Sequence, residues 1–325
     1  MRILILGLGV IGSIYGYAFQ RAGHQVEHWV RPQKRAACPK RLSVRLLDGR
    51  KEARGAEVCD DYEVRLAERG GAYDVILLSV AGGRLREAVQ ALDEAKLQGP
   101  LLLFLGHWAD REALRAALAG RRALLGFPVA GGSLRGGALS CVLFDHVMLE
   151  RRGKGNAALY DLCAGILRSA DLKLESPCDM LEWIWLHMAI NAAVITAAGR
   201  YGGVEDPARA ASLAMDSPRI LAQTVRAVRE TASIVAARGV SLRRYRGELW
   251  PYRLPARLAG LAMCRMFRAS ELTRRIMTLH GNSADLLYVC RSVYECGRAA
   301  GVDAPVFYAN YAAVEAALEK STRQK

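Results

Sequence analysis

The first half of the chain alternates short strand-like runs with amphipathic stretches of helical period. The strand-like runs, bounded by turn residues, predict strands at Ile3–Leu6, Val26–Val30, Leu42–Leu47, Glu52–Val58, Val75–Val80, Leu101–Leu105, Ala123–Phe127 and Leu139–Leu149. The amphipathic stretches predict helices at about Val10–Ala22, Arg84–Ala95 and Arg111–Leu118. Strands that alternate with helices form βαβ units, so we expect an α/β fold with a largely parallel sheet.

Helical patterns dominate the second half of the chain. Capping signals, a proline at a helix start and a terminal glycine predict helices at about Asp179–Ala198, Ser217–Ala237 and Thr273–Ala300. The mixed stretch Ser241–Phe267 contains two prolines and is interpreted as a linker between helices or a mobile lid. We therefore expect two domains, residues 1–171 and 172–325, the second of them all-helical.

Composition narrows the class of protein. The 325 residues are 52% hydrophobic and 24% charged, which is typical of a globular enzyme and excludes a mainly disordered chain. None of the eight cysteines forms a CxxC pair or lies at ligand spacing from a histidine, so we expect no metal site and no disulfide framework. This cysteine usage favours a reducing cytoplasm.

The chain is basic, with a formal net charge of +14, and 18 Lys and Arg against 8 Asp and Glu follow residue 218. Such an excess suits nucleic acid, an anionic membrane surface or an anionic small molecule, or else reflects an arginine-rich proteome. No basic stretch alternates with aromatic residues as in single-strand binders, which argues against nucleic acid. The apolar run Trp183–Ala198 is too short to span a bilayer, so no membrane insertion is expected.

The strongest motif directly follows the first predicted strand and opens a helix. It has the spacing GxGxxG and consists of Gly7, Leu8, Gly9, Val10, Ile11 and Gly12. In this context the first glycine permits a tight turn, the second lets the backbone approach a pyrophosphate, and the third lets helix and strand pack closely. The motif predicts a dinucleotide site at the helix N-terminus, the alternative being a glycine-rich turn without a ligand.

The end of the second strand indicates which dinucleotide is bound. An NAD-binding domain normally has Asp or Glu there, to bond the ribose hydroxyls. Here Arg31 follows the strand, with Lys34 and Arg35 close behind. A guanidinium suits a 2′-phosphate, so we expect NADP, with a solvated basic loop as the alternative.

The chain resembles the ketopantoate reductase (2-dehydropantoate 2-reductase) family. The resemblance rests on the GLGVIGSIYG segment, on Arg31, on the helix that contains Asn191, and on Gly301–Pro305, which is similar to that family's closing G-x-x-x-P turn. It implies a Rossmann domain followed by an all-α domain like that of 6-phosphogluconate dehydrogenase. It further implies a substrate between the domains, dimerisation, and NADPH-dependent reduction of a 2-keto acid with a helix lysine as general acid.

Several positions depart from the family pattern. The motif Lys-x-x-x-Asn reads His187 to Asn191, Ala81 stands at a second lysine position, and Gly106 replaces an asparagine and is followed by His107. The family's late carboxylate aligns with Asp285, with His280 and Asn282 just before it. These differences argue against ketopantoate itself as substrate.

The replacements still allow reduction chemistry. Hydride transfer to a carbonyl develops an alkoxide, which needs a proton donor, and an imidazole with an ordinary pKa of about 6.5 can serve. His187 and Asn191 are four residues apart and share a helix face. We therefore expect an NADP-dependent oxidoreductase acting on a small, anionic carbonyl or imine compound, with His187, Asn191 and Asp285 at the reacting site. The alternative for His187 is a packed core histidine. The alternatives for the whole protein are a non-catalytic NADP sensor or scaffold, and a membrane-surface protein that uses Arg243–Arg275.

Overall fold

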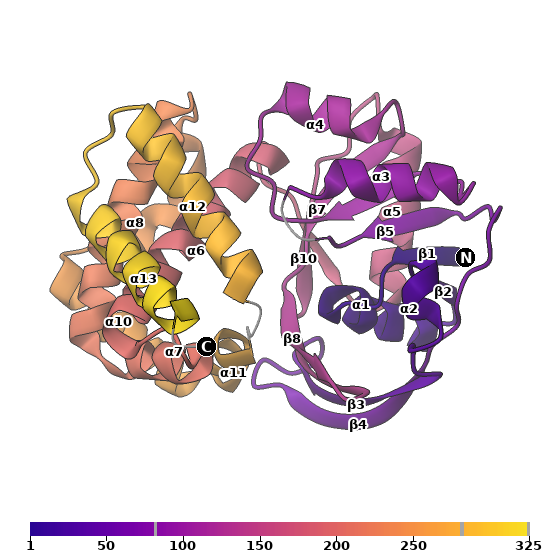
Figure 1. The fold of residues 1–325 in the computed structure, drawn as a ribbon, viewed down its shortest axis with the longest axis horizontal. Helices are drawn as coiled ribbons and strands as arrows, with labels where there is room; N and C mark the ends of the chain where they lie inside the picture. The colour runs from indigo at the N-terminus through magenta and orange to yellow at the C-terminus, as the bar shows by residue number, and fades with distance from the viewer. Residues whose placement is uncertain (81–82, 280–282, 324–325) are drawn as a thin grey trace. The chain divides into compact units, whose positions relative to one another are not determined.

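The computed structural model describes residues 1–80, 83–279 and 283–323, and the chain divides into two compact units, Met1–Leu181 and Glu182–Lys325 (Figure 1). The first unit is α/β and the second is helical, as the sequence predicted. The boundary had been expected between residues 171 and 172. That placement was wrong because Lys173–Glu175 forms a strand that pairs with His146–Leu149 of the first unit.

A seven-stranded sheet organises the first unit. Its strands, in spatial order, are β11 (Lys173–Glu175), β10 (His146–Leu149), β7 (Ala123–Phe127), β6 (Leu101–Phe104), β5 (Val75–Leu78), β1 (Arg2–Leu6) and β2 (Gln25–Trp29). From β2 to β7 all neighbours are parallel, and only β10 runs antiparallel to β7. The sheet is connected by α1 (Val10–Arg21), α2 (Pro32–Arg35), α3 (Leu85–Glu94), α4 (Arg111–Leu118) and α5 (Ala157–Ser169). The predicted Rossmann-like arrangement is confirmed.

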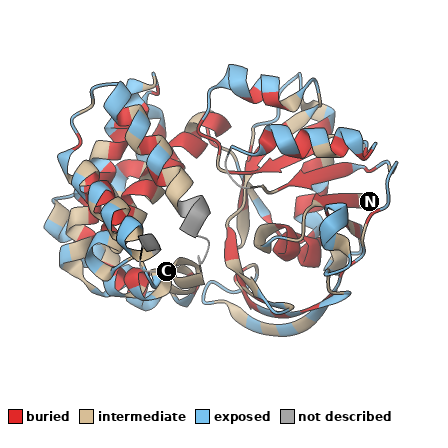
Figure 2. Cartoon of the chain, in the orientation of Figure 1, coloured by how far each residue is buried: buried red, intermediate tan, exposed pale blue. Residues whose placement is uncertain are grey.

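The central strands of this sheet are buried on both faces. Every residue of β5 and β6 is buried, because helices cover the sheet on either side, whereas the outer surfaces of α3 and α4 are exposed (Figure 2). Continuous apolar strands of this kind are typical of parallel sheets. This explains why short runs without polar alternation were sufficient to predict them.

A second sheet packs against α1. It has the order β4 (Ala56–Glu63), β3 (Arg41–Asp48), β9 (Ala138–Leu143) and β8 (Ala130–Arg135). One hydrophobic core joins β1 and α1 to the inward residues of β3 and β9, such as Leu42 and Leu139. Helix α1, which carries the last glycine of the GxGxxG motif, is therefore held between two sheets.

Three local predictions in this region were wrong. The strand expected at Glu52–Val58 begins at Ala56, because the chain first turns at Glu52–Gly55. The strand expected over Leu139–Leu149 is two strands in different sheets, separated at Phe144–Asp145. No strand was expected between Phe127 and Leu139, but Gly131 and Gly132 lie in β8, where a Cβ at Gly132 would meet the Ser140 carbonyl oxygen at 2.5 Å.

The second unit is helical. Its elements are α6 (Met180–Gly202, beginning at the boundary), α7 (Pro207–Asp216), α8 (Pro218–Ala237), the 3-10 turn η1 (Leu242–Tyr245), α9 (Arg246–Arg253), α10 (Ala256–Ala269), α11 (Glu271–Leu279), α12 (Ser283–Ala299) and α13 (Pro305–Arg323). The helix expected over Thr273–Ala300 corresponds to α11 and α12, and residues 280–282 lie outside the described residues. Gly301 follows α12 with φ +64°, in agreement with its predicted capping role.

The stretch Ser241–Phe267 is not a linker or a lid. It forms η1, α9 and most of α10, and α10 packs closely on α8, since a Cβ at Gly260 would lie 2.5 Å from the Pro218 carbonyl oxygen. Several of its apolar side chains are exposed, among them Trp250 and Leu258. Whether the basic stretch contacts membrane surfaces stays an untested hypothesis.

Helix α6 forms the core of the second unit. By length and hydropathy it is the one described helix that could cross a bilayer, but two thirds of its most apolar 18-residue window is buried inside the protein. Burial on this scale is typical of the central helix of a globular unit. The polar residues His187 and Asn191 are therefore unusual in this helix and point to the site described next.

Candidate active site

The turn from β1 to α1 has the geometry of a dinucleotide-binding loop. Gly7 adopts a left-handed backbone conformation with φ +88°, which side chains disfavour, and its N–H donates to the Trp29 carbonyl oxygen at 2.8 Å. A Cβ at Gly12 would lie 2.7 Å from Ile5 Cγ2, so only glycine lets α1 approach β1 this closely. A Cβ at Gly9 would meet nothing within 4 Å, which leaves open space beside the start of α1. The loop therefore fits a pyrophosphate.

A buried histidine supports this loop from below. The Nδ1 of His28 lies 2.7 Å from the Gly7 carbonyl oxygen, and its Nε2 lies 2.6 Å from the Tyr62 hydroxyl. A carbonyl oxygen only accepts, so Nδ1 carries the proton and Nε2 accepts from Tyr62. Burial lowers the pKa of His28 to about 4, which keeps the ring neutral at physiological pH. Sequence reasoning missed this residue because it considered His28 only as part of a strand.

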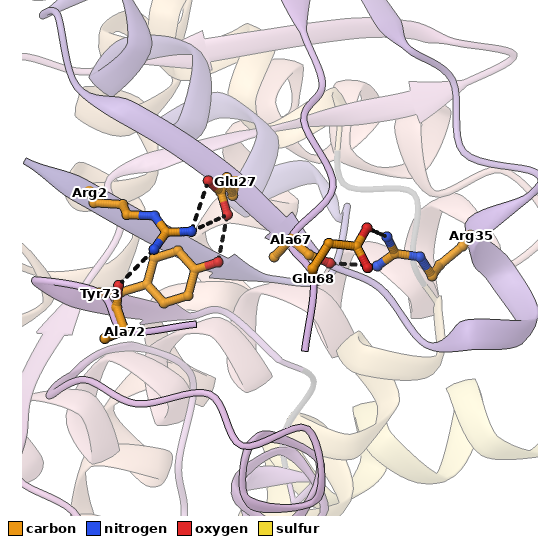
Figure 3. Close-up of polar contacts among 7 residues, drawn as sticks. All are labelled: Arg2, Glu27, Arg35, Ala67, Glu68, Ala72 and Tyr73. Carbon is orange, nitrogen blue, oxygen red and sulfur yellow. Dashed lines mark hydrogen bonds and ion pairs between the residues drawn. The ribbon is translucent and has the colours of Figure 1, made fainter. Parts of the chain in front are cut away.

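The acidic residue of β2 is engaged elsewhere in the protein. The Glu27 carboxylate accepts two hydrogen bonds of 3.2 Å from Arg2 and one of 2.6 Å from the Tyr73 hydroxyl (Figure 3). Arg2 also lies over the Tyr73 ring, 4.5 Å from its centroid. Glu27 is therefore neutralised within the sheet and is two residues short of the strand end where a ribose would lie.

Of the three cations after β2, only Arg35 is held by side-chain hydrogen bonds to other described residues. Its guanidinium donates to the Ala67 carbonyl oxygen and to the Glu68 carboxylate, both at 2.6 Å (Figure 3). It also lies 5.8 Å from the Trp29 ring centroid. Arg31 is exposed at the N-terminus of α2, and its side chain makes no hydrogen bond or ion pair with a described residue. Arg31 is thus placed to meet a ligand, while Arg35 holds the loop.

The topology places these groups at the edge where parallel sheets bind ligands. The chain leaves β1 toward β2 on one side and returns to β5 on the other side of β1. Ligands of open parallel sheets bind outside the carboxyl ends of the strands at such a reversal. Gly7 follows the carboxyl end of β1 and Arg31 that of β2.

A second site lies within the helical unit. A cavity of about 360 Å³ is lined on α6 by Trp183, His187, Asn191 and further residues at helical spacing. The Trp183 and His187 rings stack with centroids 4.8 Å apart and planes 14° apart, which orients the imidazole. His187 and Asn191 are thus brought together on the wall of one cavity.

Side chains that bind metal ions are scattered, not clustered, among the described residues. Among the described residues no cluster of three or more His, Cys, Asp or Glu side chains is arranged to hold a metal ion. All eight cysteines are free, and burial raises the pKa of the thiols of Cys141, Cys163 and Cys290 to about 12. These three thiols pack as small apolar groups rather than serving as nucleophiles.

The N-terminal part of the chain is similar to a known protein family. Residues 3–140 match the profile of the family described as ketopantoate reductase PanE/ApbA. The resemblance to ketopantoate reductases is confirmed. None of the curated proteins with which the chain was compared matches it.

Solved structures share the whole fold at low identity. A 2-dehydropantoate 2-reductase from Geobacter metallireducens has a TM-score of 0.67 at 17% identity, covering 98% of this chain and 100% of its own. D-mandelate dehydrogenase in a ternary complex with NADH and anilino(oxo)acetate has a TM-score of 0.68 at 16% identity, covering 98% and 99%. Yersinopine dehydrogenase with bound NADP⁺ has a TM-score of 0.64 at 12% identity, covering 98% and 91%. At these identities the likeness shows the fold.

Other positions implied by the ketopantoate reductase resemblance fall as follows. His107 follows β6 and is buried. Arg84 is exposed and forms an ion pair with Glu87, 2.9 Å away on α3. Asp285 lies on α12, but its side chain is not described, and Ala81, His280 and Asn282 lie outside the described residues. The roles predicted for these last four positions stay predictions.

Proposed function

We propose that this protein is an NADPH-dependent oxidoreductase that reduces a small 2-oxo acid, or an imine derived from one, through His187 and Asn191. The observation that carries the proposal is the pairing of these two polar side chains on one cavity wall, in the middle of a predominantly apolar helix. The chain that contains this helix also has a dinucleotide-binding turn, as expected of the ketopantoate reductase family.

The first unit contributes the cofactor site in this proposal. Gly7 to Gly12 would hold the pyrophosphate at the start of α1, and Arg31 would pair with the 2′-phosphate. Engagement of Glu27 by Arg2 and Tyr73 supports NADPH over NADH, because β2 offers no other carboxylate for the ribose hydroxyls. When bound, NADPH supplies the hydride that reduces the carbonyl carbon.

The second unit contributes the proton. Asn191 donates a hydrogen bond to the substrate's carbonyl oxygen and holds it near His187. His187 donates a proton to that oxygen as negative charge develops on it, which yields a 2-hydroxy acid. Asp285 is proposed to contribute from α12. Free cysteines support a cytoplasmic location, and a dimeric ketopantoate reductase from Staphylococcus aureus among the structural neighbours supports a homodimer.

The decisive experiment is an NADPH-oxidation screen over 2-oxo acids and their imines, followed by His187→Asn. We expect turnover to fall roughly a hundredfold to ten-thousandfold, with NADPH affinity unchanged. His146→Asn is the matched control, since His146 lies on β10 in the other unit. Full turnover of His187→Asn with an unmoved pH profile would remove His187 from the mechanism. Tight NADPH binding without oxidation of any compound would favour the alternative that the protein is a non-catalytic NADP sensor.

A further inference from the structure

The cavity beside His187 is built by six helices of the second unit. Nineteen residues line its volume of about 360 Å³, and they come from α6, α7, α8, α9, α10 and α11. This volume lies at the lower end of the range for pockets that bind small organic ligands. It is far larger than the methyl group of the smallest 2-oxo acids requires, so the cavity is shaped for a larger substituent.

The lining is predominantly apolar, and among the described residues it includes no Lys or Arg. Thirteen of the nineteen residues are apolar, and four of these are methionines: Met215, Met263, Met266 and Met277. The six polar residues among the described lining are His187, Asn191, Thr224, Glu248, Tyr252 and Thr273, so Glu248 is its one carboxylate. A substrate carboxylate placed deep in this cavity would lose its hydration near Glu248 and would meet no Lys or Arg among the described lining residues, which is unfavourable.

The positions of the two polar α6 residues set the direction of the substituent. A carbonyl oxygen bound by His187 and Asn191 lies at the cavity wall, so one substituent of the carbonyl carbon extends into the cavity. Phe267 and Met215 are buried members of the lining and offer that substituent a non-polar surface. Methionine side chains are flexible and adapt to ligands of different shape.

We propose that this cavity binds a bulky apolar substituent, branched aliphatic or aromatic, of the 2-oxo acid, while the carboxylate is held outside it. This inference rests on the proposed function, because it assumes a carbonyl oxygen at His187 and Asn191. It makes the protein a reductase of 2-oxo acids with large apolar side chains and a poor one for pyruvate.

Binding of graded 2-oxo acids tests the proposal without turnover. Pyruvate, 4-methyl-2-oxopentanoate and phenylpyruvate are titrated calorimetrically into the protein saturated with NADP⁺, which has no hydride to transfer. Each methylene removed from water contributes about fourfold in affinity. We expect 4-methyl-2-oxopentanoate to bind roughly twentyfold to sixtyfold tighter than pyruvate, and phenylpyruvate at least as tightly. Equal dissociation constants across the series, or a preference for pyruvate, would overturn the proposal.

Two variants locate the bound substituent. Ala198→Leu places three extra carbons on the cavity wall, and the matched control Ala262→Leu adds them on the exposed face of α10. We expect the preference for phenylpyruvate over pyruvate to shrink to less than fivefold in Ala198→Leu and to persist in Ala262→Leu. If Ala198→Leu does not fold, Met277→Gln serves, since it keeps the length of the side chain but makes it polar. Equal preference in all folded variants would show that the substituent binds elsewhere.

Failure of the two proposals can be distinguished. Graded binding without NADPH oxidation would retain the apolar cavity and refute the reductase. Oxidation of NADPH at equal kcat/KM with all three acids would retain the reductase and refute the role of the cavity.

Discussion

Acidification should destabilise this protein through one buried ring. His28 is fully buried beneath the dinucleotide loop, and burial lowers its pKa from about 6.5 to about 4. In the unfolded chain the ring takes up a proton as the pH falls through 6.5, whereas in the folded protein it does so only near pH 4. The unfolded state therefore binds more protons in this window, and stability falls as the pH falls.

The magnitude follows from the size of the pKa shift. A shift of this size corresponds to on the order of 3 kcal/mol, lost between pH 6.5 and about pH 4. Glu150 and Glu230 act in the opposite sense, because burial raises the pKa of both carboxyl groups. Through these two groups, acidification increases the stability of the folded protein. Asp48, whose pKa is lowered, loses its contribution mainly below the window. A variant that lacks only the His28 titration is therefore needed to isolate the effect.

The assay is urea unfolding at intervals from pH 7.5 to pH 4.0, for the wild type and for His28→Phe. The variant loses the hydrogen bonds to Gly7 and Tyr62, so it is less stable at neutral pH. Its free energy of unfolding should nevertheless fall less on acidification, by on the order of 3 kcal/mol. His146→Phe, on β10 in the same unit, is the control. Parallel pH dependence of the wild type and His28→Phe would refute the reasoning.

Three further predictions concern the cofactor loop and the substrate. NADPH should bind at least tenfold tighter than NADH, about 1.4 kcal/mol, and fluorescence titration should show that Arg31→Ala removes most of this gap while exposed Arg54→Ala keeps it. Ketopantoate should be a poor substrate, because Gly106 lacks the family's asparagine amide, and turnover on the order of 10 per second would contradict this. Gly16→Ala should lower thermal stability by roughly 1 to 3 kcal/mol, since its Cβ would lie 2.3 Å from the Tyr62 hydroxyl; an unchanged melting temperature would show that Tyr62 moves freely.

The elements that sequence predicted well are those determined locally. The Gly7–Gly12 turn and the buried strands β1, β5 and β6 depend on backbone freedom and on runs of apolar residues, both of which are visible in a few consecutive positions. β8 was missed because its glycines resemble a loop when read alone. Their role is evident only from β9, which approaches Gly132 so closely that a side chain would not fit.

In the candidate site, too, the locally determined features were predicted and those that depend on packing were not. His187 and Asn191 were found because a polar pair four residues apart is conspicuous on an apolar helix. The cavity that they line was not predictable, because its walls come from helices between residues 183 and 277 whose packing no local pattern reveals. The sequence nevertheless contained one indication of an apolar cavity, the methionines Met263, Met266 and Met277, from which no prediction was drawn.

The replacement of a lysine by His187 and the character of the cavity point to the same substrate chemistry. A lysine at this position would bring an ammonium group on a flexible stem, which attracts anionic and polar groups. An imidazole stacked on Trp183 is shorter than a lysine side chain and is held in one orientation by the stacking. With no Lys or Arg among the described lining residues, the cavity offers little attraction for a carboxylate, while His187 offers a proton donor for the carbonyl oxygen. Substituting His187→Lys should therefore restore polar substrates at the expense of apolar ones, a change in specificity that a purely structural histidine would not produce.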